Sequence, residues 1–162
     1  MHVLLGKLAT YIRENNYEKA KNTALRLQDL FGKDNFFLEL QDHGIPDQTK
    51  VNTALLKMSK ETGIDLVATN DIHYTFKEDA EAHDILLCIQ TGKKVQDEDR
   101  MRYEGGQYYL KSPEEMQRLF PYAREAIENT ARLPNVVMLK SYLENRKCQN
   151  TMCQKDTLQL RI

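Results

Sequence analysis

The hydrophobic positions of this chain follow two spacings, one typical of helices and one typical of short buried strands. Apolar residues three and four positions apart predict a helix that starts after Asn16 and another that starts at Pro46 or Asp47. Glycines follow both patterns, Gly32 after the first and Gly63 after the second. Because glycine adopts the left-handed conformation that ends many helices, both glycines mark natural stops.

Short apolar segments follow these two helices. Residues 35–41 and 65–69 are the predicted strands, and residues 107–110 form a weaker candidate. Strands that alternate with helices imply parallel βαβ units, so we expect an α/β fold. No linker or internal repeat suggests a second domain.

The remaining helices have less regular patterns. Residues 3–14 carry a poor helical signal, and 122–131 predict a last helix. Ser112 begins another helix, with proline at its first position and a glutamate that completes a capping box. A helix near 78–91 is expected to bury one stripe of residues, namely Ala82, Ile85, Leu86 and Ile89.

Composition excludes some classes of protein. The chain has 162 residues, 41% hydrophobic and 29% charged, with a net charge of -1. This length suits one domain with a sizeable core, and the charge balance gives no general basic surface for nucleic acid. No apolar run approaches a membrane span, so we expect no membrane partner. Three cysteines form no CxxC pair, which fits a reducing cytoplasm.

Polar clusters follow the two predicted strands. His43 lies in the sequence QDHG after the first strand, and Asp71 and His73 lie in NDIHY after the second. Positions two apart on an extended chain point to the same side, so Asp71 and His73 are expected to face one spot if the extended conformation continues beyond the predicted strand. His43 would join them if the strands are near neighbours, because the carboxyl ends of parallel strands share one edge. Two imidazoles and a carboxylate suit Zn²⁺, Mn²⁺ or Fe.

Polar residues at strand ends also have a simpler interpretation. Asp and Asn are common there as turn formers and helix caps, so the pattern alone leaves both interpretations open. His83 lies within a predicted helix, and we expect it to pack or to support other groups rather than bind metal. The charged run 97–102 is expected to be a solvated loop. The chain has no P-loop, GxGxxG fingerprint or Ser/His/Asp triad.

Longer stretches of the sequence resemble a known family. FFLELQDHGIPDQ, LVATNDIHYTFKEDAEAHDILLCIQTGK, YYLKSPEEM and EAIENT are similar to the PHP (polymerase and histidinol phosphatase) domain of bacterial DNA polymerase III alpha subunits. The resemblance covers about residues 9–131. It implies the carboxyl-terminal part of a distorted (β/α)₇ barrel, with a metal cluster where the strands end. In the family, the residues at His43, Asp71 and His73 belong to that cluster.

The resemblance also implies a function. The whole polypeptide would be a cytoplasmic DNA-directed DNA polymerase that uses DNA, deoxynucleotides and Mg²⁺ and contacts other replisome subunits. The PHP part, with a divalent metal such as Zn²⁺ or Mn²⁺, would act as a phosphoesterase or 3′–5′ exonuclease, or serve as a scaffold without chemistry. A stand-alone PHP-type phosphatase is the alternative, and the lack of an amino-terminal His-x-His motif disfavours it.

The sequence departs from the family pattern at both ends. The His-x-His strand and the polymerase aspartates are missing, so residues 9–132 are expected to form a partial PHP domain that is inactive by itself. Residues 133–162 have no convincing apolar period. Read one base out of frame, with permitted codons, they resemble the family's continuation, which predicts a frameshifted tail in which Cys148 and Cys153 have no role. Such a chain is expected to be marginally stable or to aggregate.

Overall fold

A computed structural model of the protein describes residues 6–136, and most of the predicted tail, from 137 onward, lies outside this range. The elements in chain order are α1 (Lys7–Arg13), α2 (Tyr17–Phe31), β1 (Leu38–Leu40), α3 (Pro46–Thr62), β2 (Leu66–Ala68), the 3₁₀ turn η2 (Lys77–Asp79), α4 (Ala80–Thr91), the 3₁₀ turn η3 (Glu104–Gly106), α5 (Pro113–Leu119) and α6 (Arg124–Val136). None of these helices combines the length and apolar character that crossing a membrane needs.

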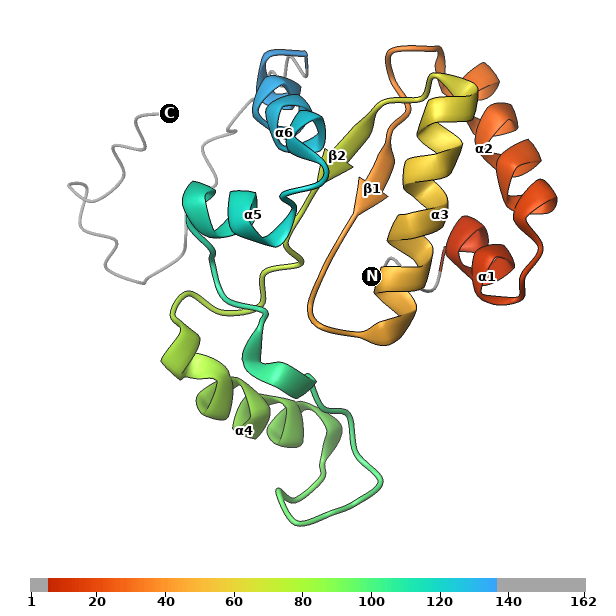
Figure 1. Ribbon diagram of the computed structural model, residues 1–162. Helices are drawn as coiled ribbons and strands as arrows, with labels where there is room; N and C mark the ends of the chain where they lie inside the picture. The colour runs from red at the N-terminus through yellow and green to blue at the C-terminus, as the bar shows by residue number, and fades with distance from the viewer. Residues whose placement is uncertain (1–5, 137–162) are drawn as a thin grey trace, which may run out of the picture.

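The two strands form a parallel sheet at the centre of the fold. Leu38 pairs with Leu66 and Leu40 pairs with Ala68, and all four side chains belong to the main core. Helix α3 packs against β1, α6 packs against β2, and α1 and α2 lie outside α3 (Figure 1). The structure therefore confirms a mixed fold of helices and parallel strands, with strands shorter than the patterns predicted.

Local sequence signals place the helices as expected. The Asn16 side chain accepts a hydrogen bond from the Lys19 N–H and caps α2. Gly63 ends α3 in the left-handed conformation, at a φ of 71°. Ser112 and Glu115 form the predicted capping box at the start of α5, with hydrogen bonds of 3.2 and 2.8 Å. These caps satisfy backbone groups that a helix end otherwise leaves open.

Helix α6 closes the outer edge of β2 with side chains. The Asn129 Nδ2 donates to the Leu66 carbonyl at 3.0 Å. The Thr130 hydroxyl accepts from the Ala68 N–H at 3.0 Å and lies 2.9 Å from the Ala68 carbonyl. Backbone groups that would otherwise pair with a third strand are thus satisfied by a helix.

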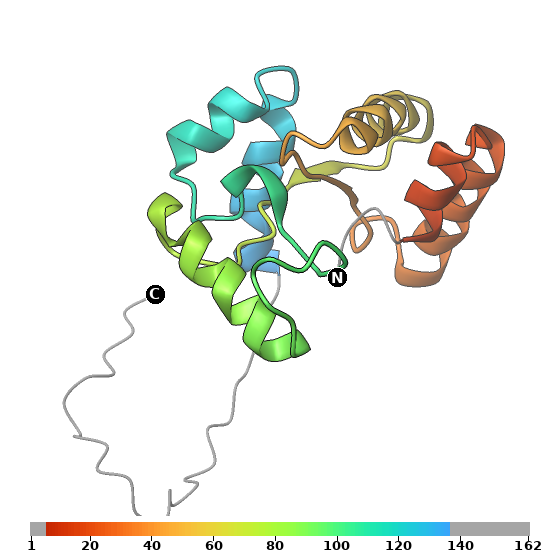
Figure 2. The ribbon, with the colours of Figure 1, turned by 90° about the horizontal axis from the view of Figure 1, so that it is seen from below.

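The predicted burial of α4 is wrong. Ile85, Leu86 and Ile89 are 46, 61 and 73% exposed, while Leu87 and Cys88 are the buried residues of this helix. Seen from below, α4 lies against the segment that leads to η3 (Figure 2). The spacing correctly identified an apolar stripe on α4, but within the described residues that stripe faces solvent instead of the core.

Two other predicted elements differ in extent. Residues 107–110 do not form a strand, because only a single parallel bridge joins Tyr74 to Tyr109. The last helix begins at Arg124 and continues to Val136, past the predicted end at residue 131.

Candidate metal site

The candidate site lies at the edge of the sheet where both strands end. β1 and β2 are hydrogen-bonded neighbours, which is the condition on which the predicted convergence of His43 with Asp71 and His73 depended. His43 follows β1 and the other two residues follow β2. The parallel pairing therefore brings both segments to one side of the sheet.

Asp71 and His73 face each other, as their spacing predicted. The Asp71 Oδ1 lies 3.5 Å from the His73 Nε2, and their side chains are 19 and 29% exposed. The His73 N–H donates to the Tyr108 carbonyl at 2.8 Å, and the Leu110 N–H donates to the Tyr74 carbonyl at 3.2 Å. The segment around Tyr108 thus fixes the backbone that presents the pair.

His43 is deeply buried, with 3% of its surface exposed. Its backbone N–H donates to the Gln48 Oε1 at 2.7 Å, and its Nδ1 lies 3.0 Å from the Gln48 Nε2. The Asp42 carboxylate accepts from the Gly44 N–H at 2.9 Å and forms the turn between β1 and α3. Gly44 has a φ of 77°, a conformation that a side chain would strain.

Tyr108 lies between the buried histidine and the exposed pair. Its ring stacks on His43, with centroids 4.2 Å apart and planes 9° from parallel, and contacts His73 edge-on at 5.7 Å. Tyr108 itself is only 2% exposed. Sequence reasoning missed this residue, because the turn-like segment before it carries no periodic signal.

His83 and Tyr103 complete the rim around His73. Their rings lie 5.5 and 4.4 Å from the His73 ring, and 5.2 Å from each other. Burial lowers the pKa of His83, the neighbouring His73 lowers it further, and Asp84 partly opposes the shift. A neutral imidazole packed beside the site agrees with the supporting role that the sequence suggested for His83.

Arg100 positions the loop that carries Tyr103. Its guanidinium makes two hydrogen bonds to the Asp84 carboxylate, at 2.5 and 2.7 Å, and its side chain is 5% exposed. The expectation of a solvated loop at 97–102 is therefore wrong for this residue. A run of mostly charged residues gave no indication that the side chain of one of them would be buried.

Lys111 lies on the segment that follows η3. Its ammonium donates to the Asn70 Oδ1 at 3.1 Å and to the Gln107 carbonyl, and lies 4.4 Å from the centre of the Tyr109 ring. Burial lowers the pKa of Lys111, against the opposing influence of Glu115 and Asp42. These contacts tie the segment after η3 to the end of β2.

The donor set fits a divalent metal in part. The separation of the Asp71 and His73 ligand atoms lets both reach one ion, and carboxylate with imidazole suits zinc or manganese. His43 belongs to the same edge, but Gln48 covers its Nδ1. Within residues 6–136, no three or more His, Cys, Asp or Glu side chains are arranged to hold a metal ion. Among the described residues, two candidate ligands thus face each other, and the third candidate, His43, lies behind Tyr108.

Sequence comparison gives the family context of this site. No family model matches the chain. DNA polymerase III subunit alpha from Campylobacter jejuni is 44% identical over 144 residues, covering 85% of this chain, and the Borreliella burgdorferi protein of the same name is 49% identical over 128 residues, covering 79%. The Helicobacter pylori protein is 40% identical over 154 residues, covering 89%. This chain is a relative of the DNA polymerase III alpha subunit.

The match concerns one segment of a much longer protein. The chain spans 12, 11 and 13% of the length of the Campylobacter, Borreliella and Helicobacter alpha subunits. These names confirm the resemblance to DNA polymerase III alpha subunits.

Proposed function

We propose that this chain forms part of the PHP domain of a DNA polymerase III alpha subunit, and that residues 9–132 are a portion of its (β/α)₇ barrel. The observation that carries the proposal is the 40–49% identity to proteins of that name. The whole polypeptide would extend a DNA primer from deoxynucleotides with Mg²⁺, together with other replisome subunits in the cytoplasm. The segment itself would lack the polymerase active site.

The proposed role of the site is metal-dependent phosphoester hydrolysis of the 3′–5′ exonuclease type. Asp71 and His73 would hold a Zn²⁺ or Mn²⁺ ion, and His43 is the third ligand that the family resemblance implies. A bound ion would polarise a phosphoryl oxygen and lower the pKa of a bound water. Tyr103 and His83 would exclude bulk water from the face of His73, which they cover.

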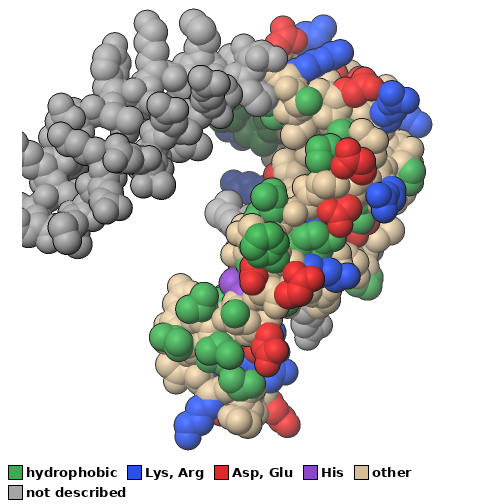
Figure 3. Space-filling model, turned by 90° about the vertical axis from the view of Figure 1, so that its left-hand side faces the viewer, with side chains coloured by type: hydrophobic (Ala, Val, Ile, Leu, Met, Phe, Trp, Pro, Cys, Tyr) green, Lys and Arg blue, Asp and Glu red, His purple; other side chains and the backbone are tan. Residues whose placement is uncertain are grey.

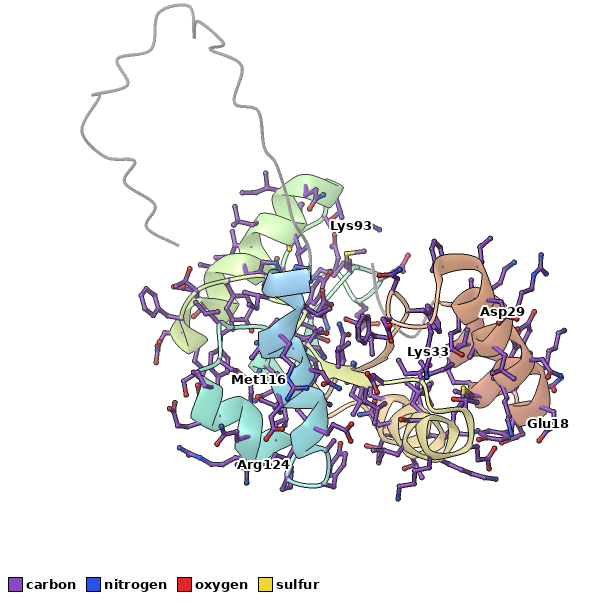
Figure 4. All side chains as sticks on the ribbon, turned by 90° about the horizontal axis from the view of Figure 1, so that it is seen from above. Glu18, Asp29, Lys33, Lys93, Met116 and Arg124 are labelled. Atoms are coloured by element: carbon purple, nitrogen blue, oxygen red, sulfur yellow. The ribbon has the colours of Figure 1, made fainter. Side chains whose placement is uncertain are left out.

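Metal titration of the 162-residue chain tests this proposal. We expect Asp71→Asn and His73→Asn each to weaken binding of Zn²⁺ or Mn²⁺ at least tenfold, because each removes a ligand. Asp29→Asn is the matched control, since Asp29 lies on α2 away from the site (Figure 4). Binding that is unchanged in both site variants would disprove the metal site. Nuclease activity on single-stranded DNA, measured with the same variants, then tests the chemistry.

A scaffold without chemistry is the second candidate. The exposed apolar stripe of α4 favours it, because such a surface suits contact with other protein. A scaffold would keep its thermal stability when metal is removed with a chelator, whereas occupied metal sites stabilise the folded state. A stand-alone phosphatase is less favoured, since the relatives are much longer proteins.

A further inference from the structure

Gln48 holds His43 at two points inside the protein. Its amide oxygen accepts from the His43 backbone N–H at 2.7 Å, and its amide nitrogen lies 3.0 Å from the His43 Nδ1. The two residues are 1 and 3% exposed. Stacking on Tyr108 at 4.2 Å also fixes the plane of the imidazole. Neither the ring nor the amide can turn without losing these contacts.

The backbone contact decides which way the amide faces. A backbone N–H can only donate, so the atom opposite it must be the amide oxygen. The amide NH₂ then faces the His43 Nδ1. Because an NH₂ group of this kind only donates, Nδ1 must accept. A neutral imidazole carries one ring proton, and here it is on Nε2.

This tautomer opposes metal binding by His43. A protonated Nε2 has no lone pair for a metal, and Gln48 covers Nδ1. Histidines that bind metal through Nε2 usually donate their Nδ1–H to an oxygen acceptor. For His43 to bind in that way, the proton must move to Nδ1 and the Gln48 amide must reverse. The amide NH₂ would then face the His43 N–H, so two donors would oppose each other.

We propose that Gln48 is a positioning residue that sets the tautomer of His43 and thereby limits its use as a metal ligand. The proposal rests on the proposed metal site, because only a metal makes the tautomer matter for function. Gln48 contacts neither Asp71 nor His73 through any hydrogen bond among residues 6–136. Its influence on the site therefore passes through His43.

The tautomer can be measured directly in the metal-free chain. Two-bond ¹H–¹⁵N correlations of the histidine rings distinguish Nε2–H from Nδ1–H, with His43 assigned by its loss in His43→Asn. At about pH 8, where an ordinary imidazole is neutral, we expect Nε2–H in the wild-type protein. An Nδ1–H ring at His43 would overturn the proposal, whatever the metal affinity.

Gln48→Glu tests the link to metal binding. A carboxylate can accept from both the His43 N–H and Nδ1–H, so it favours the tautomer whose Nε2 is open to a metal. We expect Zn²⁺ affinity, measured by competition with a coloured chelator, to rise about tenfold. Gln48→Met tests the same point without charge, because it removes the donor to Nδ1 and should abolish the fixed tautomer.

Gln107→Glu is the charge control, because the Gln107 side chain donates to the Gly105 carbonyl and not to the His43 ring nitrogen that Gln48 faces. It should leave the His43 tautomer unchanged and raise Zn²⁺ affinity less than Gln48→Glu does. Equal affinities in wild type and Gln48→Glu, with zinc bound by both, would overturn the proposal and leave the metal site standing. If neither protein binds zinc, the proposed metal function fails, while the ring tautomer still decides the role of Gln48.

Discussion

At the scale of single residues, one ion pair connects α4 to the loop that covers the site. Arg100 joins Asp84 through two short hydrogen bonds and also donates to the Val95 carbonyl at 3.2 Å. The Arg100 guanidinium lowers the pKa of the Asp84 carboxyl. Since Tyr103 lies three residues after Arg100 and contacts His73, this pair supports the rim of the candidate site.

The Asp84–Arg100 pair predicts a specific acid sensitivity. Because the pKa of Asp84 is lower in the folded protein than in the unfolded chain, its stabilising contribution is complete above about pH 4 and is lost as the pH falls further. We expect the melting temperature of the wild type to fall more steeply below about pH 4 than that of Asp84→Asn. Thermal melts followed by circular dichroism across this range measure the difference.

The exposed Asp29 provides the control for this experiment. Asp29→Asn should retain the wild-type dependence on pH, because it leaves the Asp84–Arg100 pair intact. Parallel curves for wild type and Asp84→Asn would show that the pair contributes nothing to the acid sensitivity.

At the scale of elements, helix α6 serves as the boundary of the sheet. Thr130 makes its hydrogen bonds to the Ala68 backbone from a partly buried position, and the neighbouring Asn129 is 8% exposed. Ala68 immediately precedes the segment that carries Asp71 and His73. By holding the end of β2 in place, α6 therefore also fixes the start of the segment that carries the candidate ligands.

Replacing Thr130 with valine tests this boundary. The substitution keeps the shape of the side chain and leaves the Ala68 N–H without its acceptor, so we expect a loss of about 1–3 kcal/mol in the free energy of unfolding. Thr53→Val on the exposed side of α3 is the matched control and should change stability by less than about 0.5 kcal/mol. Urea unfolding of the three proteins gives the comparison. A Thr130→Val protein as stable as the control would mean that water replaces the lost bond.

The sequence predicted the positions of the helices better than the tertiary contacts that they and the site residues make. Asn16, Gly63 and Ser112 act locally, so the helices they begin or end could be placed from the sequence. Periodicity located the stripe of α4 but could not tell which neighbour covers it, because burial depends on tertiary contacts. The facing of Asp71 and His73 follows from local geometry. The insertion of Tyr108 between His73 and His43 depends on a distant segment that no local pattern identifies.

At the scale of the whole molecule, α4 is apolar on two opposite sides. Leu87 and Cys88 face this part of the protein, whereas Ile85, Leu86 and Ile89 face solvent. Hydrophobic side chains gather on the surface of the lower part of the molecule, where α4 lies (Figure 3). A helix that is apolar on both sides is normally buried on both. The alpha subunits that this chain resembles are far longer. If the chain is part of such a subunit, as proposed above, the rest of the subunit would be available to cover the outer face.

Without such a cover, the chain by itself should associate through this helix. We expect the wild-type chain to form oligomers as its concentration rises, and Leu86→Glu with Ile89→Lys to remain monomeric in sedimentation velocity, because the charges oppose burial of the stripe. The double variant should keep the wild-type melting temperature, since both side chains are exposed. Leu87→Glu, on the buried side, should instead lower that temperature markedly. A wild-type chain that stays monomeric at every concentration would show that the exposed stripe is too small to drive association.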